Sequence, residues 1–351
     1  MFDKIKALVR KINGSDRKIK LSVVLANFNH GAMIGGAIEA ILQQSYKNWE
    51  LIIVDDGSTD GSQEIIDTYA LRDPRIKTIF FPENRGPNEA FRSGINKASG
   101  ELLYGAAADD FLTDDQFFAC AVEAIELNPT VSGAFSCTRV ISGNDGRELW
   151  TMGTAPHVGL NTQLESLSAF FENRIFIPGS SAIWKLELVQ QLGGFDQALG
   201  PQSDYFINHA LPAIGGVVFM DRVSTSLRLF ENSYSSDVSD DDFFNRHALV
   251  ESKLRMLPIL AEIPSEKIYH WRDSIINGRL GYSRQRPFYL AIRTAADNIL
   301  PYEQRSLPRA FLSLLEYAVK EGSLLSEELE RRILAAHSIF DKIAGKIQLT
   351  N

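Results

Sequence analysis

Two pairs of adjacent aspartates each close a short apolar run of the chain. Asp55-Asp56 follows residues 51–54, and Asp109-Asp110 follows residues 101–108. An apolar run of strand length indicates a strand buried in a parallel sheet. Ligands of open α/β sheets bind at the carboxyl ends of such strands, so each pair is expected to present its charge in a crevice.

The second pair, Asp109-Asp110, has the residue types that hold a hard divalent cation. Such a cation, bound together with two phosphate oxygens, needs one or two carboxylates and open coordination positions. In transfer from a diphospho-sugar, the cation offsets the charge that develops on the leaving group. The alternative is a helix-capping cluster, because Thr113, Asp114 and Asp115 follow.

The first pair continues into Gly57-Ser58. Two adjacent acids after four apolar residues cost free energy to bury without a partner. One of them can accept a hydrogen bond from a base N–H or a ribose hydroxyl, while Gly57 permits close approach of the backbone to a ligand. A capped turn that uses Asp55 and Ser58 is the alternative.

Three further sites carry weaker signals. The loop Asn27-Phe28-Asn29 offers amides to a base or a diphosphate and a ring to stack on a base, or it is a plain turn. Arg85 and Arg92 can bind phosphate bidentately, or they lie on a solvated face. Asp204 begins an apolar helix, where it is either an N-cap or a general base within reach of an acceptor hydroxyl.

The elements that must position these residues alternate between strand and helix. Four alternations within about 90 residues indicate a doubly wound parallel sheet, and therefore the α/β class. The expected strands are 21–26, 49–54, 75–81 and 101–106, and the expected helices between them are 33–44, 60–70 and 88–97.

Beyond residue 110 the pattern is less regular. Asp60 with Gln63, and Thr113 with Gln116, predict capping boxes at the starts of two helices. The remaining expectations are irregular structure over 142–163, separate strands at 216–221 and 223–229, and helices alone from about residue 241.

Composition limits the function classes. The 351 residues carry a net charge of −8, which argues against a general nucleic-acid binder. The two cysteines, Cys120 and Cys137, are expected to be buried thiols rather than a disulfide framework. With no apolar run long enough to span a membrane and no signal-peptide core, the expected location is cytoplasmic.

The first twenty residues form a basic amphipathic pattern. Residues 1–20 hold seven Lys and Arg against two Asp, so 7 − 2 gives a charge of +5. Apolar residues recur there at helical spacing, which predicts adsorption to the anionic inner face of the cell membrane. The alternatives are a helix docked on its own domain or a solvated terminus.

Taken together, these motifs resemble the family 2 glycosyltransferases of the GT-A fold. Many short motifs occur in one fixed order, so the resemblance is specific, and it covers about residues 21–235. In chain order it rests on residues 22–24, 27–29, 41–46, 49–62, 84–86, 98–101, 109–110, 193–196 and 203–204.

The resemblance implies inverting transfer from a nucleotide-diphospho-sugar, a UDP-sugar as the family's usual donor, with Mn²⁺ or Mg²⁺ as cofactor. It implies that Asp56 binds the base, that Asp109 and Asp110 contact ribose and metal, and that Asp204 deprotonates the acceptor hydroxyl. The implied nucleotide-sugar site consists of Ala26, Asn27, Phe28, Asn29, Asp56, Arg85, Arg92 and Asp109.

Some positions depart from the family pattern. Its Asp-x-Asp-Asp motif reads Ala107-Ala108-Asp109-Asp110, and its Glu-Asp acceptor motif reads Ser203-Asp204. Arg228 follows the last core strand where the family often has a histidine, and it could carry part of the charge. Ala26 stands where threonine is common, and Phe28 where tyrosine is common.

The sequence therefore predicts four regions: a basic arm (1–20), a nucleotide-sugar-binding half (21–110), an acceptor-binding half (111–240) and a helical region (241–351). The predicted activity is sugar transfer to a glycan or glycolipid in cell-surface polysaccharide assembly. The alternative is a catalytically weak GT-A protein that acts as a nucleotide-sugar-binding or assembly scaffold.

Overall fold

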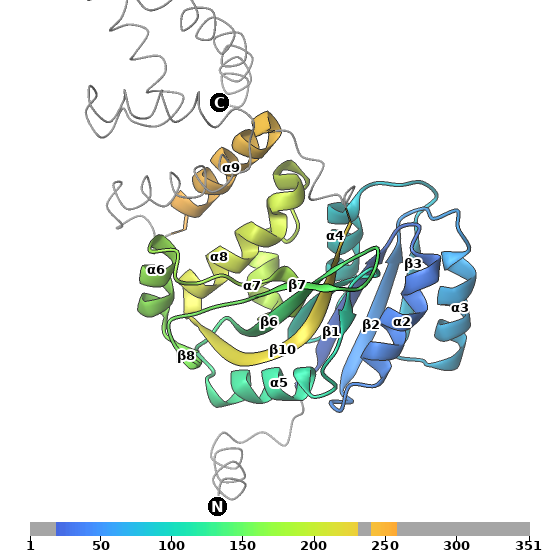
Figure 1. Ribbon diagram of the computed structural model, residues 1–351, viewed down its shortest axis with the longest axis horizontal. Helices are drawn as coiled ribbons and strands as arrows, with labels where there is room; N and C mark the ends of the chain where they lie inside the picture. Colours follow the sequence, from blue (N-terminus) through green and yellow to red (C-terminus); the bar gives the residue numbers. More distant parts are fainter. Residues whose placement is uncertain (1–18, 231–239, 258–351) are drawn as a thin grey trace, which may run out of the picture. The chain divides into compact units, whose positions relative to one another are not determined.

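The computed structural model describes residues 19–230 and 240–257 (Figure 1). The chain divides into two compact units: residues 19–230 and 249–257 belong to the first, which carries the sheet and the site, and residues 240–248 belong to the second. The predictions for the basic arm up to residue 18 and for helices beyond residue 257 lie outside the described residues.

The first half of the sheet is the predicted alternation of strands and helices. Its four strands are parallel and lie in the order β3-β2-β1-β4. The elements are β1 (Leu21–Asn27), α2 (Gly31–Leu42), β2 (Trp49–Asp55), α3 (Ser62–Arg72), β3 (Ile76–Phe80), α4 (Pro87–Lys97) and β4 (Leu102–Ala107).

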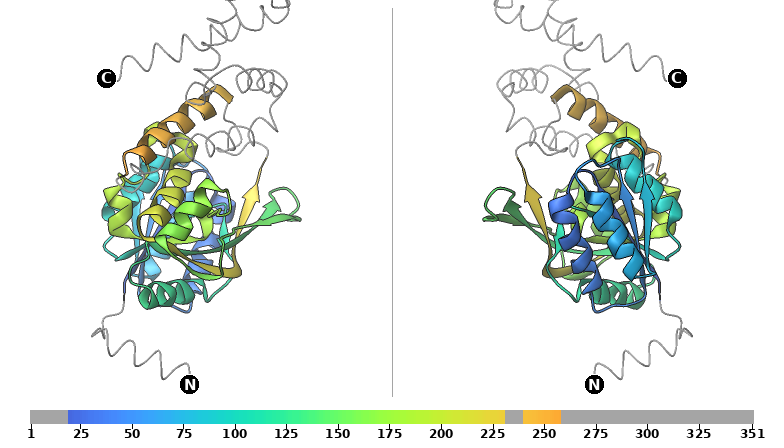
Figure 2. Two further views of the ribbon diagram at one scale, coloured as in Figure 1. Left: turned by 90° about the vertical axis from the view of Figure 1, so that its left-hand side faces the viewer. Right: turned by 90° about the vertical axis from the view of Figure 1, so that its right-hand side faces the viewer.

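Every residue of β1 and β2 is buried, as expected for strands covered on both faces. Val23 and Leu25 pack with Ile34 of α2 in the main core. Val24 faces the opposite side, where it lies so close to Gly94 that a Cβ there would be 2.3 Å from its Cγ1. Figure 2 shows α2 and α4 on opposite sides of these strands.

The second half extends the sheet through β9, β6, β10 and β5. β9 is antiparallel to both β4 and β6, whereas β10 is parallel to β6. The elements are β5 (Phe111–Leu112), α5 (Phe117–Leu127), β6 (Gly133–Ser142), β7 (Glu148–Met152), β8 (Gly159–Asn161), α6 (Gln163–Phe171), η1 (Gly179–Ser181), β9 (Ala182–Lys185), α7 (Leu186–Gln191), η2 (Gln197–Gln202), α8 (Ser203–Gly215), β10 (Val217–Leu229) and α9 (Asp240–Arg255).

Two strand predictions were wrong. The segment 142–163 contains β7 and β8 because it pairs with the sheet at β6 and β10. The two strands expected between 216 and 229 are one strand, β10, which keeps its pairing with β6 through register shifts between Met220 and Thr225. Such an irregularity bends a strand without ending it.

Both capping-box predictions were wrong. Helix α5 begins at Phe117 without a side-chain cap, because Thr113 continues the strand and its N–H donates to the Ser224 carbonyl. Helix α3 begins at Ser62, and Gln63 reaches Asp55 instead of capping.

Both cysteines are free thiols, with Cys137 buried and Cys120 partly exposed. Within the described ranges, each helix is too short or too polar to cross a bilayer.

Candidate functional site

Asp55 organises the loop after β2. It is fully buried. Its Oδ1 accepts from the Ser58 N–H at 3.0 Å and from Gln63 Nε2 at 2.8 Å, while its Oδ2 accepts from Asn27 Nδ2 at 2.7 Å. With these partners Asp55 holds the ends of β1 and β2 together, so the capped turn that uses Asp55 and Ser58 is present.

Asp56 reaches across to the loop after β3. Its Oδ1 accepts from the Arg85 N–H at 2.7 Å and its Oδ2 from the Gly86 N–H at 2.8 Å. Burial raises the pKa of Asp56, and the two backbone donors oppose that rise. A carboxylate has about four lone-pair sites, so these two bonds leave acceptor capacity on each oxygen of this buried side chain.

The turn beside Asp56 requires glycine. Gly57 has φ +75°, and a Cβ there would lie 2.6 Å from the Glu83 carbonyl carbon. The loops after β2 and β3 therefore touch through backbone alone at this point.

The loop after β1 brings Asn27 and Phe28 to the same edge. Asn27 is buried, and its Nδ2 donates to Asp55 and Ser58, whereas its Oδ1 is a buried acceptor with no protein partner in the described residues. Phe28 is 40% exposed, so its ring can stack on a ligand. Asn29 has φ +54° and uses its Oδ1 to accept from the Thr59 N–H, which makes it part of the turn.

Asp109 and Asp110 follow β4 next to the end of β1. The Ala108 N–H donates to the Ala26 carbonyl at 3.0 Å, and Ala26 pairs with Ala107 in register. The predicted sites at Asn27 and at the second aspartate pair are therefore neighbours. Helix α5 does not use either acid as its cap, so the helix-capping alternative for this pair was wrong.

Arg228 of β10 lies beside this pair. Its N–H donates to Asp110 Oδ1 at 3.2 Å, and its Nη1 donates to the Asp109 carbonyl at 2.8 Å. Its guanidinium also lies 4.6 Å from the centre of the Phe111 ring. Burial, and then the neighbouring Asp109, raise the pKa of Asp110 well above its usual value.

The two carboxylates fit a cation that is shared with a diphosphate. In residues 19–230 and 240–257, no three His, Cys, Asp or Glu side chains gather as a complete metal site. Mg²⁺ is commonly held by only one or two carboxylates plus substrate phosphates. A divalent cation here would offset both the burial and the repulsion from Asp109 that raise the pKa of Asp110.

Asp204 is the second residue of α8. The N-cap of this helix is Gln202, so the N-cap interpretation of Asp204 was wrong. Asp204 Oδ1 accepts from the Tyr205 N–H at 2.7 Å, and burial raises the pKa of the Asp204 carboxyl. Its Oδ2 lies against Gly179, where an added Cβ would be 2.7 Å away.

The short helix η1 (Gly179–Ser181) contacts Asp204 through Gly179. The Tyr104 hydroxyl donates to the Ser180 carbonyl at 2.9 Å. Burial raises the pKa of Tyr104, and the nearby charge of Asp110 raises it further. Asp204 thus contacts this three-residue turn directly, and Tyr104, which lies near Asp110, bonds to the same turn, although the two acids are 94 residues apart in sequence (204 − 110). No sequence signal points to the roles of Tyr104 and Gly179.

The two predicted phosphate-binding arginines differ in their surroundings. Arg85 lies with its guanidinium 4.8 Å from the centre of the Phe81 ring. Arg92 forms an ion pair with Glu89 on the exposed side of α4. Arg92 therefore already has a carboxylate partner. The Arg228 guanidinium, by contrast, lies 2.8 Å from the Asp109 carbonyl.

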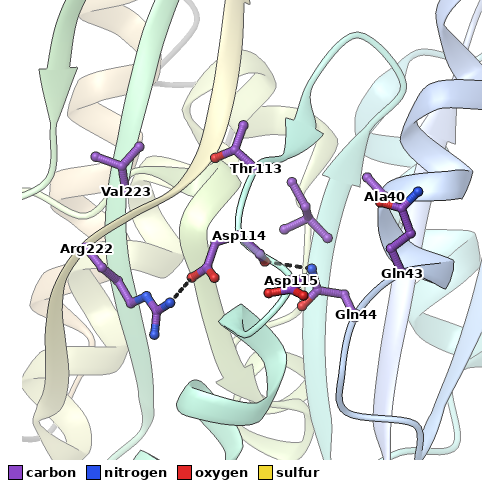
Figure 3. A pocket seen from close by; sticks show the side chains of 9 residues that line it. Ala40, Gln43, Gln44, Thr113, Asp114, Asp115, Arg222 and Val223 are labelled. Carbon is purple, nitrogen blue, oxygen red and sulfur yellow. Dashed lines mark hydrogen bonds and ion pairs between the residues drawn. The ribbon is translucent and has the colours of Figure 1, made fainter.

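A pocket of about 420 Å³ lies elsewhere, at the carboxyl end of α2 (Figure 3). The loop after β1 precedes the amino end of this helix, so the full length of α2 separates that loop from the pocket. Arg222 in the pocket pairs with Asp114 at 2.7 Å, and Gln44 donates to the Asp114 carbonyl. Arg222 and Gln44 thus both bond to Asp114, and the pocket and the loop Asn27-Phe28-Asn29 lie toward opposite ends of α2.

Several known proteins of similar sequence are named glycosyltransferases. Residues 22–186 match the family described as glycosyl transferase family 2. The chain is 27% identical to a GalNAc(5)-diNAcBac-PP-undecaprenol beta-1,3-glucosyltransferase of Campylobacter jejuni over 191 residues. The matched segment covers 54% of this chain and 59% of that protein. Over 118 residues it is 34% identical to the putative teichuronic acid biosynthesis glycosyltransferase TuaG of Bacillus subtilis, covering 34% of this chain and 45% of TuaG.

The fold is also similar to a solved structure. It matches S. aureus TarS 1-349, solved in complex with UDP-GlcNAc, with a TM-score of 0.61 and 17% identity over 84% of this chain and 83% of that one. The sequence relatives are matched over only part of their length, 59% and 45% for the two named above.

Proposed function

Since residues 22–186 are a glycosyl transferase family 2 domain on a GT-A fold, we propose that this chain transfers a sugar from a nucleotide-diphospho-sugar to a hydroxyl of a glycan or lipid-linked acceptor. The observation that carries this proposal is that Asp204 contacts the turn Gly179–Ser181, while Tyr104, whose pKa is raised by burial and then by the nearby charge of Asp110, bonds to the same turn. Asp109 and Asp110 offer carboxylates for a cation and a diphosphate, and Asp204 offers a base.

On the donor side, Asp56 and the free Oδ1 of Asn27 are available to bind the base, and Phe28 to stack on it. Asp109 and Asp110 would hold Mn²⁺ or Mg²⁺ together with the diphosphate. When bound, such a cation offsets the charge that develops on the leaving diphosphate. Arg228 places a fixed positive charge beside the same acids.

On the acceptor side, Asp204 takes the proton of the attacking hydroxyl. The new bond forms between that oxygen and the anomeric carbon, and the bond from this carbon to the diphosphate oxygen breaks. Attack opposite to the leaving group inverts the anomeric carbon. The raised pKa of Asp204 brings it closer to the operating pH, as general base catalysis favours.

The names of the two sequence relatives suggest the setting. One acts on a saccharide linked to undecaprenol diphosphate, and the other is assigned to teichuronic acid synthesis. We extend the proposal to cell-surface polysaccharide assembly at the inner face of the membrane. The basic residues 1–20 are the proposed membrane contact, and UDP-sugars are the first donors to test.

Calorimetric titration with UDP, GDP, CDP and dTDP, with and without Mn²⁺, tests the donor site. We expect one nucleotide to bind only with metal and the double variant Asp109→Asn/Asp110→Asn to lose it. Glu64→Gln/Asp67→Asn, two acids of α3 away from the site, is the matched control. The sugars of that nucleotide are then tested for transfer by wild type and Asp204→Asn.

Retention of nucleotide binding with loss of transfer in Asp204→Asn would support the proposed base. If no nucleotide binds under any condition, the enzyme assignment fails. The binding or assembly scaffold then becomes the function to pursue.

A further inference from the structure

Two side chains of α4 hold the turn that precedes Asp204: Glu89 Oε2 accepts from Gln197 Nε2 at 3.1 Å, and Asn88 bonds to the turn at three places. Asn88 Nδ2 donates to the Asp196 carbonyl at 3.1 Å, the Gly200 carbonyl at 2.8 Å and Ser203 Oγ at 3.0 Å. Two amide hydrogens are thus shared among three acceptors that span the whole turn. Asn88 itself is buried.

This turn needs the tie because its own backbone is unusual. Gly200 has positive φ together with strongly negative ψ, a conformation that is nearly restricted to glycine. Ser203 Oγ donates to the Asp196 carbonyl at 2.7 Å while it accepts from Asn88. Ser203 is the first residue of α8, so these bonds fix the helix start from which Asp204 projects.

Asn88 is equally close to the donor loop. Asp56 binds the N–H groups of Arg85 and Gly86, and Pro87 then begins α4. Proline at the first helical position presets the backbone for the helix. Asn88 therefore lies two residues beyond a backbone group that the proposed base-binding aspartate holds.

We propose that Asn88 is a positioning residue for Asp204, through which the donor loop at Asp56 sets the place of the acceptor-side base. This inference rests on the proposed transfer reaction. It assigns Asn88 no contact with substrate. It predicts that loss of the Asn88 amide donors impairs turnover while the donor site remains intact.

A further tie holds the same turn from another element. Lys253 of α9 forms an ion pair with Asp196 Oδ2 at 2.8 Å and lies 6.0 Å from the Phe206 ring centre. Both partners are about one-third exposed, and such pairs contribute little. Lys253→Ala is therefore expected to change turnover less than a substitution at Asn88.

The test compares Asn88→Asp, which keeps the shape but removes both donors, with Asn96→Asp, an exposed position on the same helix. We expect kcat to fall about a hundredfold in Asn88→Asp, with the nucleotide Kd within about twofold of wild type. The acidic limb of its pH–rate profile should shift, because the surroundings of Asp204 change. Asn96→Asp should match wild type in all three measurements.

Hydrogen exchange on the full-length chain gives a readout that does not need activity. The amides of residues 196–204 should exchange faster in Asn88→Asp and unchanged in Asn96→Asp. If wild type transfers no sugar but this difference is present, the proposed function fails while the tie stands. Unchanged exchange together with unchanged kcat overturns the inference.

Ser203→Ala keeps the test decisive if Asn88→Asp does not fold. It removes one acceptor of the Asn88 amide and should lower kcat in the same direction, by a smaller factor, with nucleotide binding kept. If either folded variant loses kcat and nucleotide affinity equally, Asn88 has only a structural role, and the proposal is overturned.

Discussion

Because Gly179 contacts Asp204, a substitution at Gly179 can move the Asp204 carboxylate while Asp204 itself is kept. In Gly179→Ala, the new Cβ would lie 2.7 Å from Asp204 Oδ2 but 3.5 Å from the Asp204 Cβ and Cγ. The overlap therefore falls on one carboxylate oxygen. The turn itself is held by the Tyr104 hydroxyl at the Ser180 carbonyl, so we expect the carboxylate to move rather than the turn.

The size of the effect follows from that distance. An ordinary contact begins at 3.4 Å, so 3.4 − 2.7 requires a displacement of about 0.7 Å. Misplacement of a catalytic group by about 1 Å can cost about a hundredfold in rate. We expect kcat to fall between about tenfold and a hundredfold, or about 1.4–2.7 kcal/mol of activation free energy.

Stability should move in the opposite direction. The φ of Gly179 lies outside the left-handed region, so alanine can adopt the native backbone. Replacement of glycine by alanine at such a position stabilises a protein by about 0.4–1 kcal/mol through the unfolded chain. The melting temperature of Gly179→Ala should therefore be equal to or above that of wild type.

The assay measures kcat and KM with the donor identified by titration, together with thermal unfolding of the same preparations. Gly36→Ala is the control, because a Cβ at Gly36 on α2 meets no atom within 4 Å. It should leave kcat unchanged. Full activity in a stable Gly179→Ala protein would refute the reasoning, since it would mean that the Asp204 carboxylate does not act at its observed place.

Three further predictions concern charge. Burial, and then Asp109, raise the pKa of Asp110 in the folded protein. Ionised Asp110 therefore destabilises the fold; this cost is absent below the unfolded pKa of about 3.9 and grows as pH rises toward the folded pKa. Asp110→Asn should raise the melting temperature of the metal-free protein at neutral pH, but not below a pH of about 3.9. Arg228→Gln removes a charged hydrogen bond to the Asp109 carbonyl and should weaken binding of the nucleoside diphosphate about tenfold in calorimetric titration. Glu50→Gln disrupts a buried carboxylate that pairs with Lys77 at 2.7 Å and should destabilise the fold by about 1–3 kcal/mol in urea, with nucleotide affinity unchanged.

The alternation of strands and helices up to β4 could be predicted because both faces of β1 and β2 are covered, which leaves uninterrupted apolar runs in the sequence. The strands β7 and β8 could not. They are edge strands whose burial alternates only weakly, and their Gly- and Asn-rich surroundings are typical of loops.

The candidate site was predictable in its residue types but not in its division of roles. Asp55 and Asp56 are adjacent and chemically identical, yet one binds Asn27 across β1 and the other binds the backbone at Arg85 and Gly86. The position of Asn88 was not predictable, because its partners lie more than 100 residues further along the chain.

The pocket at the carboxyl end of α2 has a practical consequence for finding inhibitors. A screen that follows only thermal shift would select any compound that fills this space of about 420 Å³, although the pocket lies one helix length from the loop Asn27-Phe28-Asn29. We expect a hit that fills only this pocket to bind in the presence of saturating nucleotide, so that its potency does not fall as the donor concentration rises. Competition with the nucleotide is therefore the measurement that sorts active-site compounds from those bound at the far end of α2.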